Sequence, residues 1–225
     1  MKKIGTAALL HNVKDHWVPL PVKVVWLHAA ADWAFLADWQ SVADKSKSTA
    51  ARDSLEYATL AGKRWRYLSN QSLAATSLPG LRQLLSESPS AEIGLALGLR
   101  TVNPPRRVLG FAFVRRTWAN NFMLEFLAAS PAAEGGFKGV GRTLMQTLSI
   151  IALSLRCGAL WGECTELSHG FYTSLKSRTA PAKAHTRQQH ELPDRFVFTA
   201  AELVRIAKDS QVKIEGCEPG PADES

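Results

Sequence analysis

The stretch EGGFKGVGRTLMQ, residues 134–146, decides how the rest of the chain is interpreted. It places four glycines, a lysine and an arginine directly before an apolar run. Glycines let a backbone approach a ligand closely, and a helix that starts here would direct unpaired N–H groups and the positive end of its dipole at that ligand. We therefore interpret the stretch as a loop that holds an anion, in particular a phosphate.

The segments on either side fit a loop between a strand and a helix. After Gly141, apolar residues return at helical spacing as far as Leu155. Before the loop, the segments 91–99, 107–116 and 120–130 are short, apolar and β-rich, which predicts three strands. The first two are joined by RTVNPPR, whose adjacent prolines predict a turn.

The remaining elements predict an α+β fold. We expect a mostly antiparallel central sheet flanked by helices, with an N-terminal helical elaboration and a C-terminal helix. Further strands are predicted at 21–27, 159–164 and 195–199, helices at 31–45, 49–62, 78–88, 169–175 and 200–210, and a basic loop at 176–195. Residues 1–214 are predicted to form one domain, followed by an acidic disordered tail at 215–225.

Composition is that of an ordinary globular protein, with 46% apolar and 21% charged residues in 225. Three cysteines without zinc-type spacing predict neither a disulfide framework nor a metal site, and they favour the cytoplasm. The start MKKIGTAALL is not interpreted as a signal peptide, because its apolar part stops at His11. The chain has no apolar run of about 18 residues, so we predict no membrane partner.

The net charge of +7 indicates a polyanionic ligand. The last eleven residues contain four acids and no lysine or arginine, so the rest of the chain is more basic still. A nucleotide cofactor and a nucleic acid both fit this charge.

Three kinds of phosphate loop compete for the glycine-rich stretch. Residues 136–143 match the nucleoside-triphosphate pattern GxxxxGK[ST] except that Arg142 replaces the lysine. Gly139 and Gly141 begin a dinucleotide fingerprint, but Leu144 stands at its third glycine.

The third kind of phosphate loop is the pyrophosphate loop of the GCN5-related N-acetyltransferases, the GNAT family, which GFKGVGRTLM resembles. That family has Arg or Gln, two residues, Gly, one residue, then Gly or Ala, and Gly139-Val140-Gly141 fits its second half. The order of hairpin, carboxylate-bearing strand, loop–helix, strand and Phe-Tyr helix is also similar over residues 92–175. The chain departs from the pattern at Gly136, where the family has Arg or Gln.

The resemblance implies an acyl-CoA-dependent N-acyltransferase, with acetyl-CoA as cofactor and direct transfer to an amine in a ternary complex. Its pantetheine arm would lie between the strands 120–130 and 159–164, and a bulge near Leu127 or Ala129 would direct an N–H at the oxyanion. The implied cofactor-binding residues are Leu127, Ala129, Phe137, Lys138, Gly139, Val140, Gly141 and Arg142.

Glu125 is the first candidate catalytic residue. Strand alternation predicts Met123, Glu125 and Leu127 on one face, and a carboxylate in such apolar company holds a proton more readily, which suits a general base. Its position also resembles that of the catalytic glutamate in the family's histone-acetylating branch. The alternative is a strand glutamate that faces water, and Glu163 and Glu166 are alternative bases.

Tyr172 is the second candidate. The segment FYTSL, residues 171–175, resembles the family's helix whose tyrosine protonates the sulfur of CoA. The alternative is a core tyrosine. His169, close by, is interpreted as a helix-start residue.

Two other classes of function stay open. GKRWRY, residues 62–67, and the basic segment 176–190 suit a nucleic-acid partner, either as an RNA-binding module or as a toxin-like acetyltransferase of aminoacyl-tRNA. A catalytically silent sensor of acyl-CoA is the other class. The sequence leaves the acceptor amine, the acyl group and the choice of monomer or homodimer open.

Overall fold

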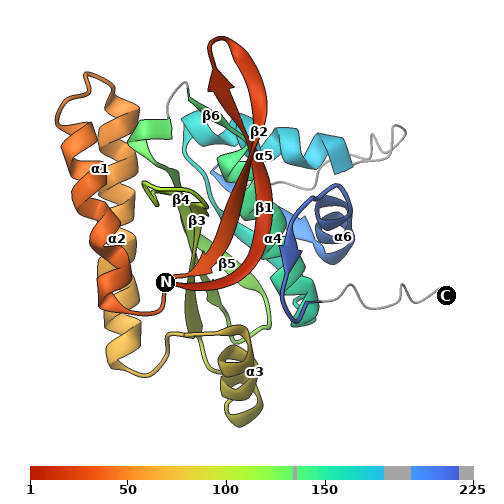
Figure 1. The fold of residues 1–225 in the computed structure, drawn as a ribbon. Helices are drawn as coiled ribbons and strands as arrows, with labels where there is room; N and C mark the ends of the chain where they lie inside the picture. Colours follow the sequence, from red (N-terminus) through yellow and green to blue (C-terminus); the bar gives the residue numbers. More distant parts are fainter. Residues whose placement is uncertain (134–135, 180–193, 218–225) are drawn as a thin grey trace.

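A mixed β-sheet forms the centre of the protein, in a computed structural model that describes residues 1–133, 136–179 and 194–217 (Figure 1). The strand order is β6-β1-β2-β3-β4-β5-β7-β8, and β9 pairs with β1. Only β5 and β7 run parallel among these pairs, so the predicted α+β class with a mostly antiparallel sheet is confirmed. The strands are β1 Lys2–Val13, β2 His16–Trp26, β3 Ile93–Thr101, β4 Val108–Arg116, β5 Phe122–Ala129, β6 Phe137–Lys138, β7 Ala159–Glu163, β8 Arg195–Thr199 and β9 Lys213–Ile214.

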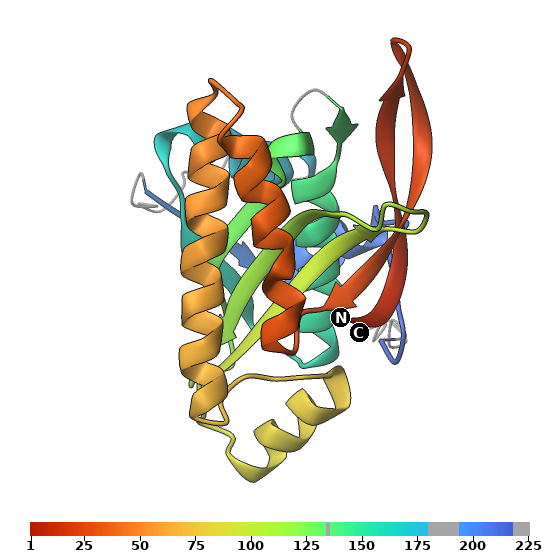
Figure 2. The ribbon, with the colours of Figure 1, turned by 60° about the vertical axis from the view of Figure 1, so that its left-hand side comes forward.

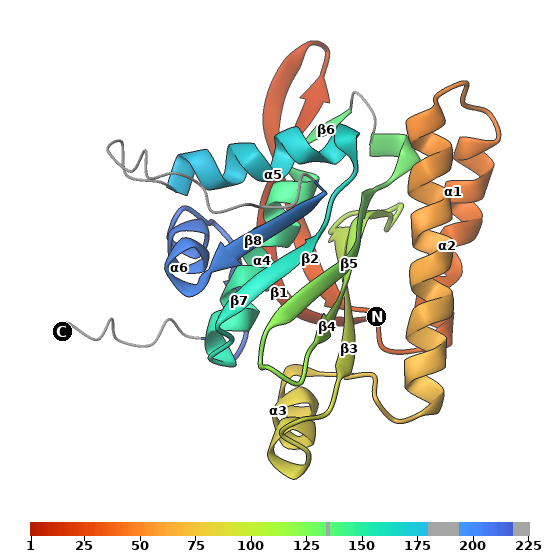
Figure 3. The same cartoon turned by 180° about the vertical axis from the view of Figure 1, so that it is seen from behind.

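Helices cover both faces of this sheet, as the view from behind shows (Figure 3). One face carries the 3-10 helix η1 (Ala30–Ala34) with α1 (Phe35–Ala43) and α2 (Thr49–Asn70). The other carries α4 (Val140–Ser154), α5 (Glu166–Thr179) and α6 (Ala200–Lys208), with α3 (Leu78–Glu87) at one end and the short η2 (Pro131–Ala133) after β5. Each face has its own apolar core, and the α1/α2 core contains aromatic rings in edge-to-face and tilted contact, such as Trp33, Trp39 and Phe111.

The N-terminal hairpin is longer than the predicted strand at 21–27. β1 and β2 pair from Lys2↔Trp26 to Val13↔His16 and project beyond the sheet (Figure 2). Their turn residues have positive φ angles of 49° and 65°, as the tight turns that fit hairpin twist require. The sequence hides β1 because a register shift after Lys3 interrupts its alternation.

Helix α2 continues eight residues beyond its predicted end at 62. Ala58, Ala61, Trp65 and Leu68 extend one buried stripe at helical spacing, and that stripe packs on the sheet. The basic stretch at 62–67 is therefore the middle of a packed helix. Helix α3 is confirmed, and the Ser77 hydroxyl caps it by accepting from the Gly80 amide.

The end of the described chain packs against β1. The Glu215 amide donates to the Ile4 carbonyl, and Cys217 is buried, so the first residues of the predicted tail are part of the fold. Residues 218–225 of that tail, and 180–193 of the predicted basic loop, lie outside the described residues. Among the described helices, none has the length and apolar character to cross a membrane.

The start of α4 lies directly on β4 because Gly110 has no side chain. A Cβ atom at Gly110 would meet Val140 Cγ1 at 2.3 Å and the Ala128 carbonyl oxygen at 3.0 Å. This close approach holds the first turn of α4 at the sheet.

Gly110→Ala tests that approach. We expect it to destabilise the fold by about 1–3 kcal/mol, because Val140 must move to make room. The matched control is Gly170→Ala in α5, where an added Cβ meets nothing within 4 Å. That change should stabilise by up to ~1 kcal/mol, because alanine favours helix. Urea unfolding of both variants measures the difference, and equal stability would contradict the packing.

Candidate functional site

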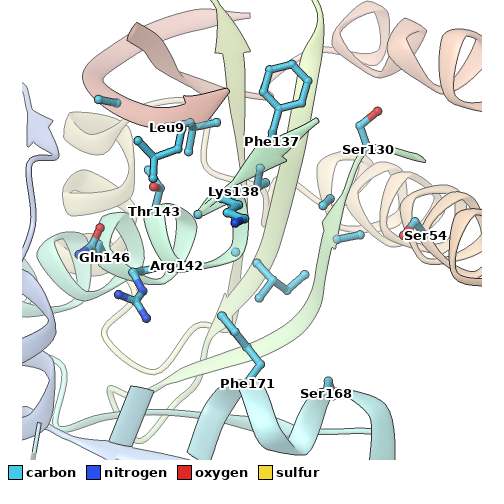
Figure 4. A pocket seen from close by; sticks show the side chains of 18 of the residues that line it. Leu9, Ser54, Ser130, Phe137, Lys138, Arg142, Thr143, Gln146, Ser168 and Phe171 are labelled. Carbon is cyan, nitrogen blue, oxygen red and sulfur yellow. The ribbon is translucent and has the colours of Figure 1, made fainter. Parts of the chain in front are cut away.

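A cavity of about 1060 Å³ opens between the β1–β2 hairpin, β5, α5 and the first turns of α2 and α4 (Figure 4). All the predicted cofactor-binding residues line it, and so does Tyr172. Glu125 is not among the lining residues. Residues that the sequence did not single out also line it, among them Ser54, Ser130, Gln146, Ser168, Phe171 and Asp209.

The glycine loop places the N-terminus of α4 at this cavity. Gly139 is the residue before the helix and has φ of 92°, a conformation that glycine adopts without strain. The first bond of the helix runs from the Thr143 amide to the Gly139 carbonyl at 2.8 Å. The amides of Val140, Gly141 and Arg142 precede that bond, and no side chain caps them within the described chain. These three residues line the cavity, so the positive end of the α4 dipole lies at its wall, an arrangement typical of anion-binding helix ends.

Two residues before this helix belong to the sheet rather than to a phosphate-wrapping loop. Phe137 and Lys138 form β6, which pairs with β1, and the Phe137 ring stacks on His11 at 4.7 Å between ring centroids. The Gly136 carbonyl accepts from the Asn12 amide at 3.0 Å. A strand at this position does not fit the continuous loop of the nucleoside-triphosphate pattern.

The two cations of the glycine loop have different surroundings. Lys138 Nζ lies 3.9 Å from the centroid of the Trp17 ring, so a cation–π contact holds it toward the hairpin. Arg142 has no ion-pair partner in the described part of the chain, and its side chain lies at the cavity in Figure 4. Arg142 is therefore the cation better placed to meet an anion at the start of α4.

Strands β5 and β7 separate at the cavity. They pair from Phe122↔Leu160 to Leu124↔Gly162, and within the described residues the pairing stops there. Leu127 and Ala129 line the cavity beyond this point. The separation leaves one edge of β5 open to a ligand that carries hydrogen-bonding groups.

An extra residue in β5 corrects two predictions. Val114 pairs with Leu124 and Phe113 with Phe126, so Glu125 is the bulged residue. The bulge was predicted near Leu127 or Ala129 and is at Glu125 instead. It also breaks the alternation, so the prediction that Met123, Glu125 and Leu127 share one face was wrong: Leu127 packs with the α4 side and Glu125 contacts α2.

The Glu125 carboxylate lies in a polar network and not in apolar surroundings. It accepts from Arg115 Nε at 2.7 Å and from Arg64 Nε at 3.3 Å, and its side chain is 12% exposed. Arg115 also pairs with Glu92. Burial lowers the pKa of Arg115, but Glu125 and Glu92 outweigh it and raise that pKa overall. The pairing ties β4, β5 and α2 together, and the catalytic role of Glu125 stays a prediction.

Tyr172 lies in an aromatic stack under the cavity. Its ring is parallel to Phe196 at 3.8 Å between centroids and perpendicular to Phe171 at 5.0 Å. Burial, with a smaller contribution from Cys164, raises the pKa of the Tyr172 phenol well above its ordinary value. Phe171 in turn covers Gly141, where an added Cβ would meet its ring at 3.2 Å. Helix α5 thus places Tyr172 in the cavity lining and Phe171 against the start of α4.

The alternative catalytic residues lie elsewhere. Glu163 is exposed and pairs with Arg195 at 3.7 Å, and Glu166 and His169 are exposed on α5 outside the cavity lining. Burial raises the pKa of the Cys157 thiol to about 12, so it is not a ready nucleophile.

The predicted nucleic-acid segments contribute little to a described surface. In GKRWRY, Trp65 is buried and Arg64 pairs with Glu125, while Lys63 and Arg66 are exposed. Most of the segment 176–190 lies outside the described residues.

No protein-family model matches the chain, and no curated protein matches its sequence. The solved structures that it is similar to include nourseothricin acetyltransferase, at 22% identity over 37% of this chain and 48% of that one, with a TM-score of 0.32. The chain thus spans about half the length of that protein. An acetyltransferase of the GNAT family from Staphylococcus aureus is 8% identical over 80% of this chain and 99% of its own, with a TM-score of 0.43. AtaTR bound with acetyl-CoA is 22% identical over 56% and 76%, with a TM-score of 0.36.

Alkaline titration tests the burial of Tyr172. Because its pKa is raised, the phenol stays protonated as the pH rises through the ordinary tyrosine range, and its phenolate forms only at stronger alkali. We expect the ultraviolet absorbance of the phenolate to show a late step that Tyr172→Phe removes. The control is Tyr67→Phe, at an exposed ring on α2, which should leave that late step in place. A late step that survives Tyr172→Phe would contradict the assignment.

Proposed function

We propose that the chain is an N-acyltransferase that transfers an acyl group, in particular acetyl, from coenzyme A to an amine. The observation that carries the proposal is the meeting of three features at one cavity: the open amides of residues 140–142, the separation of β5 from β7, and the Tyr172 phenol. No covalent intermediate on the enzyme is required, so both substrates would be bound together.

The cavity suits the parts of coenzyme A. Its diphosphate would meet the amides of Val140, Gly141 and Arg142, with the Arg142 guanidinium adding charge. Its arm contains amides, and these match the open edge of β5 beside Leu127 and Ala129. The thioester at the end of the arm would then lie deep in the cavity.

The reaction needs a neutral amine, support for an oxyanion and a proton for the thiolate. Attack of the amine nitrogen on the thioester carbon forms the C–N bond and places negative charge on the carbonyl oxygen, which a backbone N–H of β5 would stabilise. When the C–S bond breaks, the thiolate takes a proton from the Tyr172 phenol, which is the donor that we propose, and the phenolate then recovers a proton from water. The amine loses its proton to water or to Glu125.

Binding of acetyl-CoA tests the proposal directly. Gly141→Glu places a carboxylate beside the open amides, so affinity should fall at least about tenfold, which is 1.4 kcal/mol. The matched control is Gly170→Glu, at an exposed position of α5 with free space around it. Titration calorimetry compares the two, and unchanged affinity in Gly141→Glu would remove the proposal.

Rates separate the roles of the two candidate catalytic residues. Tyr172→Phe should lower kcat by about 10²-fold or more with acetyl-CoA affinity unchanged, because only proton donation is lost. For Glu125→Gln we expect mainly a lower unfolding temperature, because it removes the ion pairs with Arg64 and Arg115, and a smaller decrease from Arg64→Met, which breaks one of the two. A rate loss in Glu125→Gln that Arg64→Met does not share would instead identify Glu125 as the base.

A silent sensor of acyl-CoA is the second candidate function. Two observations favour it: arginines engage both oxygens of Glu125, and among the described residues that line the cavity only Asp209 carries a carboxylate. A sensor would also lose acetyl-CoA affinity in Gly141→Glu, but it would release no thiol with any of a broad panel of amines.

A further inference from the structure

Two cations face each other in the sheet at a place that the proposed reaction does not use. Lys23 of β2 and Arg100 of β3 are directly paired in the antiparallel register, so their side chains leave the same face of the sheet. Both are half-buried. Like charges in directly opposed positions destabilise a sheet unless something between them is negative.

Nothing in the described chain supplies that negative charge. The residues that continue the same row are Thr6 on β1 and Val108 on β4. Neither cation has an ion-pair partner among the described residues. The Nε atom of Arg100 is buried without any hydrogen-bond partner. A buried guanidinium N–H without an acceptor is costly, and an acceptor from outside would satisfy it once the Arg100 side chain moves to expose that N–H.

We propose that Lys23 and Arg100 form a binding site for a phosphate group. A guanidinium presents two parallel N–H donors to the oxygens of a phosphate, and an ammonium on the opposite strand adds a second charge. A phosphate with two negative charges neutralises both cations at once. Arg106 and Arg107, exposed in the turn between β3 and β4, add positive charge nearby.

This site is separate from the anion-binding end of α4 but close to the cavity. Neither Lys23 nor Arg100 lines the cavity. Ala8 lines the cavity, and it pairs with Pro21 on β2. Lys23 is two residues further along β2, at about 7 Å from Pro21 along the strand. The inference does not depend on acyl transfer, because it rests on the cation pair alone.

Thermal unfolding in inorganic phosphate, at constant ionic strength, tests the site. Phosphate should raise the unfolding midpoint of the unmodified protein, and Lys23→Met and Arg100→Met should each lose most of that rise. Without phosphate, Lys23→Met should unfold at a higher temperature than the unmodified protein, because the repulsion with Arg100 is gone. If the midpoint of Lys23→Met is unchanged or lower without phosphate, Lys23 and Arg100 do not repel each other, and the argument for the site fails.

Two controls separate this site from general charge effects and from the cavity. Lys63→Met removes the same charge from an exposed position on α2 and should keep the full phosphate response. Arg142→Met weakens the binding of an anion at the start of α4. In that background, the Lys23 and Lys63 variants should still differ in their phosphate-induced rise of the unfolding midpoint. An equal phosphate response in Lys23→Met and Lys63→Met would overturn the proposal.

A short single-stranded RNA distinguishes the source of the phosphate. If Lys23→Met also weakens RNA binding by about fivefold or more relative to Lys63→Met, the site accepts a phosphodiester. If only free phosphate separates the variants, it holds a small phosphorylated ligand. RNA and phosphate affinities that are equal in both variants would reject the site for either source.

Discussion

The bulge at Glu125 is the constraint on which the site depends. One extra residue in β5 sends the Glu125 carboxylate to Arg64 and Arg115 on the α2 side, and it turns Leu127 and Ala129 toward α4 and the cavity. Without it, regular alternation would place Leu127 on the face that Glu125 occupies. The ion pairs hold the bulge in place, because the carboxylate they bind belongs to the extra residue. The same strand thus joins the two layers and forms a wall of the cavity.

The fold could be predicted from the sequence where a simple period dominates. The helices α1, α3, α4 and α6 follow from apolar spacing, because each buries one face. The strands β3 and β4 follow from near-continuous apolar runs, because both of their faces are buried. The bulge at Glu125 could not be predicted, since an inserted residue leaves no mark on composition and only the partner strand reveals it. β1 was missed for a similar reason, with a register shift after Lys3. Of the site, the glycine loop was visible because its residues are contiguous, whereas Ser54 and Asp209 are brought there by the fold.

The electrostatics of the glycine loop depend more on the backbone than on side chains. The sequence places Lys138 and Arg142 on either side of the two glycines, but Lys138 contacts the Trp17 ring. What remains at the cavity is the open turn of α4 with Arg142, and Gly110 lets that turn press against β4. A helix end held this rigidly directs its amides without reorganisation when an anion arrives. The Gly136 carbonyl accepts from the Asn12 amide, so β1 also holds the residue that precedes β6.

The hairpin of β1 and β2 therefore contributes both to the cavity and to the pair of Lys23 and Arg100. Its β1 strand holds β6 and so fixes where α4 begins, and Leu10 lines the cavity. Its β2 strand carries Lys23 toward Arg100 on the face that α1 and α2 cover further along. Pairing of β2 with β3 needs only backbone hydrogen bonds and alternating side chains, so two opposed cations are not a requirement of this part of the sheet. Their position opposite each other, with the Nε atom of Arg100 buried without a partner, is the observation from which we propose that this part of the surface also meets negative charge.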